Sequence, residues 1–430
     1  MNGNLLVKNA KLRDREKLQN ILIKDGKFFS ICDADTDTAD YGDVETIDAG
    51  GNLTTPPMVD SHVHLDAVLV ADQMPRKNVT GTLIEGISLW SDWKKDITKD
   101  LIKKNAREVV DWYIANGVLR VRSHADCTEP RLQTVEALCE LRDEVKDLID
   151  IQVVAFPQDG FYTNSTNLDL MQKAVDIGVD VIGGAPHLEY TREDGVRDVE
   201  HVYDLAEKYG RLIDIHIDET GDPESKFVEV MVKESINRGM GRVSTASHTT
   251  AMHNYNNDYA YKLIRNIKKA GMSMICNPVV NAVLQNRLDG YPRRRGITRV
   301  DQMLDMGINV CLAQDSIMDP WYAMGCAKML QPTFMLLHLG QMIGTADMGK
   351  LMDMITVNPA KAMCLEEYGI EEGKQADLIV FDAKTEYDVI RVMSECTYVV
   401  RKGNVVAETT PAKRVLKYEG ASDKPVTMIP

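Results

Sequence analysis

Eight short apolar runs, most of them followed by a stretch of helical character, constrain the fold of this 430-residue chain most strongly. They span residues 57–62, 118–123, 151–156, 179–185, 212–216, 242–247, 272–277 and 308–312. Repeated strand–helix units of this kind build a barrel of eight parallel strands inside a ring of helices. The sequence therefore predicts an α/β fold with a TIM-like (β/α)8 barrel over residues 56–367.

The two ends of the chain have a different pattern. Short β-like runs split by Gly and Asp occur at residues 4–11, 20–24, 27–32 and 44–48, and again at 376–382, 396–403 and 404–407. Each end is too small to bury a core alone, which argues against two independent terminal domains. We expect residues 1–55 and 368–430 to form one small composite β-sandwich domain.

The polar residues that end the apolar runs carry the functional signal. His62 and His64 lie two residues apart on an extended segment, so both side chains point to one side and can reach one metal ion. Any single histidine could be a core or loop residue with a satisfied hydrogen bond. However, six of the nine histidines fall at strand ends, where the mouth of such a barrel carries its chemistry. The six are His62, His64, His124, His187, His216 and His248. This pattern favours a metallohydrolase.

Composition narrows the class of protein further. The formal charge of −15 argues against a nucleic-acid polymer as partner and favours a small neutral substrate. No apolar run is long enough to cross a bilayer, and residues 1–5 show no basic segment leading into an apolar one. The eight cysteines are scattered without a C-x-x-C pair, as is typical of reduced thiols. We expect a cytoplasmic enzyme without membrane contact.

Several motifs together resemble the amidohydrolase superfamily. They are TPPMVDSHVHLD at 55–66, HIDE at 216–219, SHTTAMH at 247–253 and Gln314-Asp315. Other stretches are similar to bacterial cytosine deaminases: GTLIEGI at 81–87, VVAFPQDG at 153–160, PHLEYTRE at 186–193, YPRRRGITR at 291–299 and DPW at 319–321. The resemblance extends from the N-terminal β-segments to about Val406.

The resemblance implies a metal site with four protein ligands. His62, His64, His216 and Asp315 would bind one divalent ion per subunit. Three neutral imidazoles and one carboxylate leave that ion with net positive charge, enough to lower the pKa of a water molecule. The run at 179–185 does not end in a lysine, the residue that bridges two metals in relatives, so one ion is expected. Fe²⁺ and Zn²⁺ both suit this ligand set.

We also expect the protein to form a homo-oligomer.

Three residues are candidates for catalysis. Glu219 would protonate the ring nitrogen beside the carbon that is attacked. Asp315 would accept a proton from the attacking water and pass it to the departing ammonia. His248 would hydrogen-bond the water and stabilise the developing charge. The alternatives are a surface carboxylate for Glu219 and a further metal ligand for His248.

Four residues are candidates for substrate binding. The carboxamide of Gln158 offers a donor beside an acceptor, which matches an N–H next to a C=O on a heterocycle, although it could be a plain turn residue. Phe156 and Trp321 would wall a flat ring, or pack in the core. Ser316 departs from the cytosine deaminase pattern, which has a second aspartate there. The neutral hydroxyl removes a charge and some bulk beside the ring.

These residues predict hydrolytic deamination of cytosine or a close cyclic amidine, with release of ammonia. Because of Ser316, the alternative is a creatinine deaminase that produces N-methylhydantoin. A cyclic amide hydrolase and a deaminase of isoguanine or 5-methylcytosine are weaker hypotheses within the superfamily. A hypothesis from another class is a catalytically silent metal-binding or assembly protein.

Two further motifs have ordinary interpretations. His187-Leu188-Glu189 matches half of the signature of the zinc deaminases that act on nucleosides, but the chain lacks the P-C-x-x-C that completes it. We interpret His187 as a supporting or structural residue. Arg293-Arg294-Arg295 could bind an anion, but a solvated loop or a subunit contact is the favoured interpretation.

Overall fold

The structure is a computed structural model that describes residues 3–37, 44–420 and 424–429. The domain expected from residues 1–55 and 368–430 also includes residues 1–2, 38–43, 421–423 and 430, which lie outside the described residues. All eight predicted runs form strands, in one sheet with the order β13-β12-β11-β10-β9-β8-β7-β6. They are β6 (Met58–Val63), β7 (Val118–Asp126), β8 (Asp150–Phe156), β9 (Val181–Gly184), β10 (Leu212–Ile217), β11 (Ser244–His248), β12 (Ser273–Cys276) and β13 (Asn309–Leu312). Neighbouring strands in this order pair in parallel, so their carboxyl ends meet at one mouth.

The barrel closes between its first strand and the segment that follows its last. Val63 and Asp315 form a parallel bridge. The amide of Asp315 donates to the carbonyl of His62 at 2.8 Å, and the amide of His64 donates to the carbonyl of Asp315 at 3.1 Å. Closure thus brings His62, His64 and Asp315 together. The predicted (β/α)8 barrel is confirmed.

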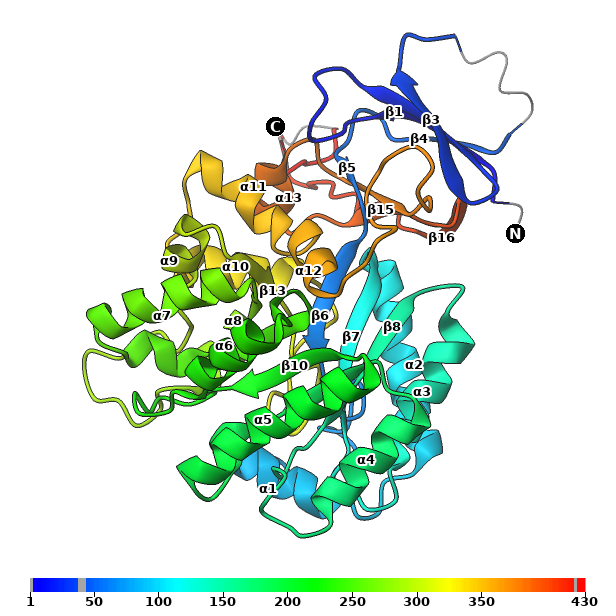
Figure 1. Ribbon diagram of the computed structural model, residues 1–430. Coiled ribbons are helices and arrows are strands. Elements are labelled where there is room, and N and C mark those ends of the chain that lie inside the picture. Colours follow the sequence, from blue (N-terminus) through cyan, green and yellow to red (C-terminus); the bar gives the residue numbers. More distant parts are fainter. Residues whose placement is uncertain (1–2, 38–43, 421–423, 430) are drawn as a thin grey trace.

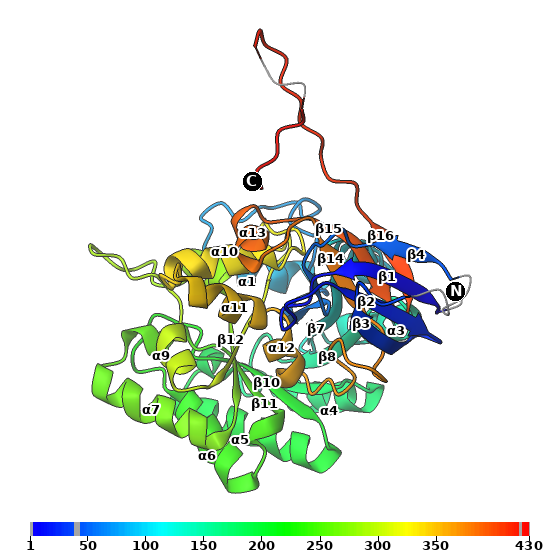
Figure 2. The same cartoon turned by 90° about the horizontal axis from the view of Figure 1, so that it is seen from above.

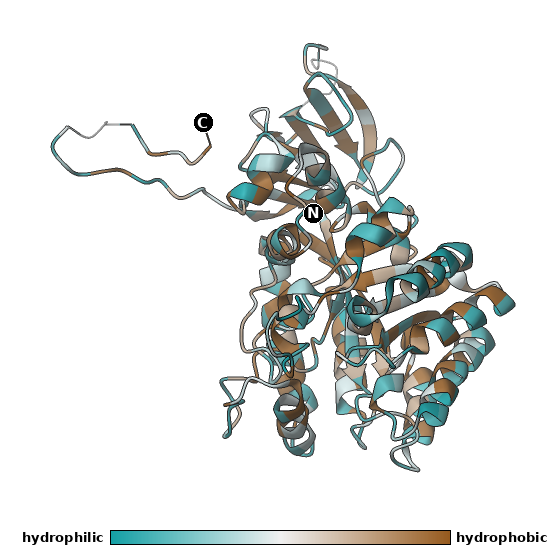
Figure 3. Cartoon of the chain, turned by 90° about the vertical axis from the view of Figure 1, so that its left-hand side faces the viewer, coloured by the Kyte–Doolittle hydropathy of each residue, from teal (hydrophilic) through white to brown (hydrophobic). Residues whose placement is uncertain are grey.

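Helices surround the sheet on its outer side (Figure 1). They are α1 (Leu83–Trp93), α2 (Lys99–Ala115), α3 (Gln133–Val145), α4 (Asn167–Ile177), α5 (Arg192–Tyr209), α6 (Phe227–Arg238), α7 (Asn257–Ala270), α8 (Pro278–Leu284), α9 (Val300–Asp305), α10 (Leu330–Leu339), α11 (Thr345–Asp353), α12 (Val357–Ala362) and α13 (Glu386–Arg391). Their ribbons carry both hydrophilic and hydrophobic residues (Figure 3), as expected for helices with one face against a core.

Helix α7 shows how the sequence encodes such a helix. The side chain of Asn256 accepts a hydrogen bond from the amide of Tyr259 and caps the first turn. The buried residues recur at helical spacing: Ala260, Leu263, Ile264 and Ile267. Gly271 ends the helix with a φ of 73°, a conformation that glycine adopts without steric cost. Among the described residues, no helix combines the length and apolar character of a membrane span.

The two chain ends form two four-stranded sheets beside the barrel (Figure 2). One has the order β3-β2-β1-β4 and the other β16-β15-β14-β5. These strands are β1 (Leu5–Ala10), β2 (Gln19–Lys24), β3 (Lys27–Asp33), β4 (Thr46–Asp48), β5 (Thr54–Thr55), β14 (Leu378–Phe381), β15 (Cys396–Arg401) and β16 (Asn404–Glu408). Side chains from both sheets, such as Leu5, Ile21, Leu378 and Val400, share one buried apolar cluster. The predicted composite sandwich is confirmed, whereas the boundaries at 55/56 and 367/368 stay predictions.

Candidate active site

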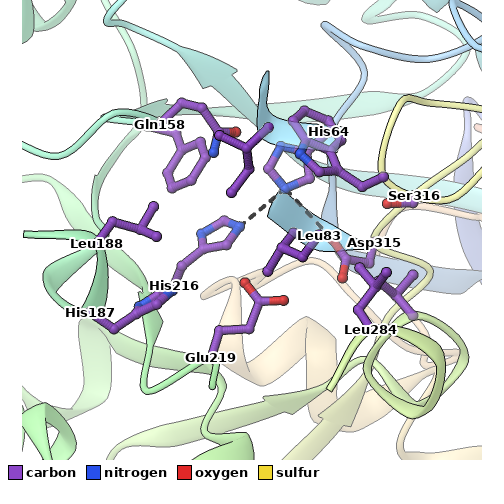
Figure 4. A pocket seen from close by; sticks show the side chains of 14 residues that line it. His64, Leu83, Gln158, His187, Leu188, His216, Glu219, Leu284, Asp315 and Ser316 are labelled. Atoms are coloured by element: carbon purple, nitrogen blue, oxygen red, sulfur yellow. Dashed lines mark hydrogen bonds and ion pairs between the residues drawn. The ribbon is translucent and has the colours of Figure 1, made fainter. Parts of the chain in front are cut away.

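A pocket opens at the carboxyl ends of the barrel strands (Figure 4). Most of the sequence-predicted site residues line it. Its lining comprises His64, Leu83, Ile87, Phe156, Gln158, His187, Leu188, His216, Glu219, Val280, Leu284, Asp315, Ser316 and Trp321. His62 and His248 are buried next to this lining, with ring centroids 4.5 and 4.9 Å from that of His216. All ten candidates therefore gather around one pocket.

The side chains of the four expected metal ligands converge, so that their ring nitrogens and carboxylate oxygens face one another. His64 Nε2 lies 3.1 Å from His216 Nε2 and 3.6 Å from Asp315 Oδ1, the two contacts drawn as dashed lines in Figure 4. His62 Nε2 lies 3.5 Å from Asp315 Oδ1 and has no hydrogen-bond partner. Burying such atoms without a partner is costly, and a cation between them removes the cost. The donor set thus fits a divalent ion.

The protonation states of the expected ligands also suit a divalent ion. Burial lowers the pKa of His64 to about 4, and it lowers the pKa of His216 well below its ordinary value. Both rings are therefore neutral, the form in which imidazole binds metals. Burial alone would raise the pKa of Asp315, but His248 and His62 outweigh burial and lower it to about 2. Its carboxylate is ionised.

A buried hydrogen-bond chain orients His62. Its Nδ1 lies 2.9 Å from Ser247 Oγ, and Ser247 Oγ donates to Asp214 Oδ1 at 2.6 Å. Asp214 Oδ2 in turn accepts from Arg122 Nη1 at 3.0 Å. Such chains fix the ring of a ligand histidine and its tautomer. His124 Nε2 also lies 3.0 Å from His62 Nδ1.

Sequence reasoning assigned no role to Asp214, Ser247 or Arg122. The period of two along a strand could have found Asp214, because it precedes His216 by two residues on β10. Ser247 directly precedes His248 on β11. Arg122 gave no usable signal, since a basic residue inside an apolar strand has many explanations.

Glu219 and His248 lie together on the far side of the pocket from Gln158 (Figure 4 labels Glu219 and Gln158). His248 Nδ1 is 3.6 Å from Glu219 Oε1 and 3.9 Å from Asp315 Oδ2. Burial, reinforced by the charge of Asp315, raises the pKa of Glu219 well above its ordinary value. Glu219 therefore keeps its proton to a higher pH than an ordinary glutamic acid, as suits a general acid.

Two amides hold the ring of His248 and a third contacts Glu219. The side-chain nitrogens of Asn277 and Asn281 lie 3.2 and 3.0 Å from His248 Nδ1. Gln285 Nε2 donates to Glu219 Oε1 at 3.3 Å. The backbone of His248 has a φ of 71°, a left-handed conformation that is uncommon outside functional sites and turns. Asn281 and Gln285 had no sequence signal.

The four candidate recognition residues also line the pocket. Gln158 stands in the turn after β8 and is 6% exposed. The ring of Phe156 stacks on that of His216 with centroids 4.0 Å apart, and the ring of Trp321 lies 5.6 Å from that of His64. Ser316, directly after the ligand candidate Asp315, is 2% exposed.

Apolar residues to which the sequence analysis assigned no role complete the walls. Leu83 and Ile87 of α1 and Val280 and Leu284 of α8 line the pocket. Motif reasoning missed them because apolar residues inside helices are indistinguishable from core residues. Leu188 was likewise missed.

The remaining motifs also have a place in the structure. His187 lines the pocket, and burial lowers its pKa to about 4, so its ring is neutral. Arg293, Arg294 and Arg295 are exposed; Arg294 pairs with Asp289, and Arg295 donates to the carbonyl of Leu339 at 2.6 Å. All eight cysteines are described, none forms a disulfide, and five are buried.

The barrel and its buried histidine–aspartate cluster fit a hydrolase that uses a divalent metal ion. The family described as "Amidohydrolase family" matches residues 45–407, so the chain belongs to this family. The protein is therefore a hydrolase that acts on C–N bonds.

Relatives span nearly the full length of the chain. A structure of 5-methylcytosine deaminase from Klebsiella pneumoniae, liganded with phosphonocytosine, is 42% identical with a TM-score of 0.91, covering 96% of this chain and 100% of that one. N-isopropylammelide isopropyl amidohydrolase from Pseudomonas sp. (strain ADP) is 29% identical, covering 94% of this chain and 97% of its own. Pterin deaminase from Rhizobium rhizogenes is 26% identical, and the match covers 92% of this chain and 90% of that protein.

Proposed function

We propose that this enzyme hydrolytically deaminates cytosine-type bases and prefers 5-methylcytosine. The observation that carries the proposal is the buried Glu219, whose pKa is raised, in one pocket with the ionised Asp315, and with the carboxamide of Gln158 across the pocket. An acid next to a base is what exchange of an amino group for an oxygen requires. The similarity to a 5-methylcytosine deaminase supports the choice of substrate.

The proposed metal ligands are His62, His64, His216 and Asp315, and Fe²⁺ and Zn²⁺ are both candidates. The bound ion supplies an activated water, because it lowers the pKa of that water. Asp315 accepts a proton as the water attacks the carbon that bears the amino group. His248 hydrogen-bonds the attacking water and stabilises the charge that develops at that carbon.

Glu219 protonates the adjacent ring nitrogen, so that the ring carbon becomes tetrahedral without building up charge on the ring. The proton held by Asp315 then passes to the departing amino group, the C–N bond breaks, and ammonia leaves. The ring keeps the oxygen of the water as a carbonyl, and the remaining proton of that oxygen returns to Glu219 as the carbonyl forms. Water is the only co-reactant, and the reaction needs no oxidant or reductant.

Recognition is assigned to four side chains. Gln158 donates to and accepts from the N–H and C=O edge of the base. Phe156 and Trp321 sandwich the flat ring. Ser316 replaces a carboxylate that would crowd and repel an apolar substituent, so the 5-methyl group has space and no buried charge beside it.

The test is an ammonia-release assay on purified, metal-replete protein with 5-methylcytosine, cytosine, creatinine and isoguanine. We expect the highest kcat/KM for 5-methylcytosine, followed by cytosine. Mass spectrometry of the product separates deamination, which exchanges NH for oxygen, from ring opening, which adds water. Creatinine as the fastest substrate would replace this proposal with the creatinine deaminase alternative. Release of ammonia from none of the four compounds would refute it.

A further inference from the structure

Lys94 caps the C-terminal end of α1, directly after Trp93, and has a buried ammonium group with three partners. It is 5% exposed. Its Nζ lies 2.9 Å from Asp126 Oδ2, 2.6 Å from Asp159 Oδ2 and 3.0 Å from Thr128 Oγ1. Three acceptors use all three donors of an ammonium group. None of these residues belongs to the proposed catalytic set.

The partners of Lys94 lie at the carboxyl ends of two neighbouring strands, β7 and β8. Asp126 ends β7 and also accepts from Trp90 Nε1 of α1 at 2.8 Å. Asp159 directly follows Gln158 in the turn after β8. The ammonium group therefore connects helix α1 to the turn that presents the recognition amide.

Helix α1 is itself tightly placed against the pocket. Leu83 and Ile87 line the pocket from its first turns. Gly86 packs on the loop of Trp321: a Cβ atom there would lie 2.8 Å from Trp321 Cδ1 and 2.9 Å from the carbonyl of Pro320. At the other end, Arg131 Nη2 donates to the carbonyl of Lys94 at 3.1 Å. Helix α1 is therefore held in place against the pocket, so the contact with Lys94 fixes the position of Asp159 relative to that helix.

We propose that Lys94 is a positioning residue that holds the Gln158 turn against α1 and thereby sets the affinity for the substrate's hydrogen-bonding edge. Asp159 Oδ2 accepts from Lys94 at 2.6 Å and from Thr128 Oγ1 at the longer distance of 3.2 Å, so the ammonium group is the shorter contact and the one that links the turn to α1. Asp126 has further partners in Trp90 and in Thr128 Oγ1 at 2.6 Å. The assignment of Gln158 to the substrate edge rests on the proposed function. The mechanical link between α1 and the turn does not.

The decisive variant is Asp159→Asn, which weakens the link to the turn but leaves Lys94 paired with Asp126. The side chain of Asp159 is 36% exposed, so the variant leaves no isolated buried charge. A charge-assisted hydrogen bond is replaced by a neutral one, and we expect KM to rise about tenfold with kcat within about twofold. The matched control is Asp92→Asn, which removes an exposed carboxylate from α1 that pairs with Lys95 and Arg76.

A second variant tests the ammonium group directly. Lys94→Met keeps the length of the side chain but leaves Asp126 buried without its cation, so it is expected to raise KM further and to lower the melting temperature. Lys95→Met, next in sequence and exposed, is its control. If Lys94→Met fails to fold, Asp159→Asn alone decides the proposal.

Two measurements separate this proposal from the proposed function. In a Gln158→Ala background the effect of Asp159→Asn on KM should disappear, because the recognition amide is already gone. Amide hydrogen exchange should accelerate in residues 156–163 of Asp159→Asn and stay unchanged in Asp92→Asn. A wild-type enzyme inactive on every base would refute the proposed function, while hydrogen exchange would still report on the link. Unchanged exchange, or a fall in kcat with unchanged KM, would overturn the role of Lys94.

Discussion

The pocket has two walls that are built differently. The wall with the proposed metal ligands consists of strand ends: His62 and His64 on and after β6, His216 on β10, and Asp315 where the barrel closes. The second wall, which holds the candidate recognition residues, consists of a turn, helices and a loop that carry Gln158, the apolar side chains of α1 and α8, Ser316 and Trp321. Pairing between barrel strands positions the backbone of the first wall, whereas side-chain contacts position the turn and helices of the second.

Because of this difference, the residues that carry out the reaction and the residues that select the substrate are positioned by different kinds of contact. Backbone pairing places the ligand-bearing residues whatever side chains face the substrate, so one catalytic wall can serve many substrates. Side-chain contacts such as that of Lys94 with Asp159 change with single substitutions. We therefore expect substitutions in the first wall to abolish turnover and those in the second to redistribute it among substrates.

The largest effect is expected for Asp315→Asn in the strand-end wall. The amide cannot accept the proton of the attacking water and is a poorer metal ligand, so activity should fall by at least about 10³-fold. Metal analysis and ammonia release measure both losses. Asp301→Asn, an exposed aspartate on α9, should behave as wild type. Retention of full metal content and turnover would remove Asp315 from the site.

Glu219→Gln should separate chemistry from metal binding within the same wall. The variant cannot deliver a proton, and we expect kcat to fall by about 10² to 10⁴-fold while metal content is unchanged. The catalytically silent alternative predicts no measurable change. Loss of metal in this variant would instead assign Glu219 to the ligands.

The pH dependence of kcat follows from the raised pKa of Glu219. Burial and the charge of Asp315 keep the acid form populated above its ordinary range, and deprotonation as pH rises through the folded pKa removes the proton donor. The rate should therefore fall as pH rises through this pKa, at a higher pH than an ordinary glutamic acid would give. Glu219→Gln should lose this falling limb in its residual activity, and a wild-type limb on the acid side alone would contradict the assignment.

Ser316→Asp tests the recognition wall. The added carboxylate crowds the space assigned to the 5-methyl group, and one methyl group in a pocket is worth about 10 to 200-fold in kcat/KM. We expect the ratio of 5-methylcytosine to cytosine to fall by about tenfold or more, with metal content unchanged. An unchanged ratio would exclude Ser316 as a determinant of specificity.

The smallest effect is expected for Ser247→Ala, which breaks the chain between His62 and Asp214. Supporting hydrogen bonds of this kind typically contribute about 10 to 100-fold to metal affinity, and we expect the lower end because His124 also contacts His62. Competition with a chelator measures the affinity. Ser61→Ala is the control, since that buried hydroxyl has no hydrogen-bond partner. Equal affinities in the two variants would mean that the chain does not act on the metal.

Much of the fold was predictable because the relevant signals are local. Alternation and apolar runs indicate which residues are buried within one strand, and all eight barrel strands and the terminal β-segments follow from them. The histidines that end these strands also predict the mouth of the barrel. Lys94 and Arg122 had no comparable signal, since each is buried only because distant carboxylates, Asp126 and Asp214, meet it in the fold.

The sequence by itself determined the strands, the composite sandwich and the list of residues able to bind a metal, because these depend on side-chain type and short-range periodicity. Only the tertiary structure decided which of these residues meet. Asp315 lies beside His62 because the first strand pairs with the segment after the last, across more than two hundred residues. The link from Lys94 to the Gln158 turn likewise depends on where α1 packs. Contacts between residues far apart in the chain depend on strand order and helix placement, which no local pattern records.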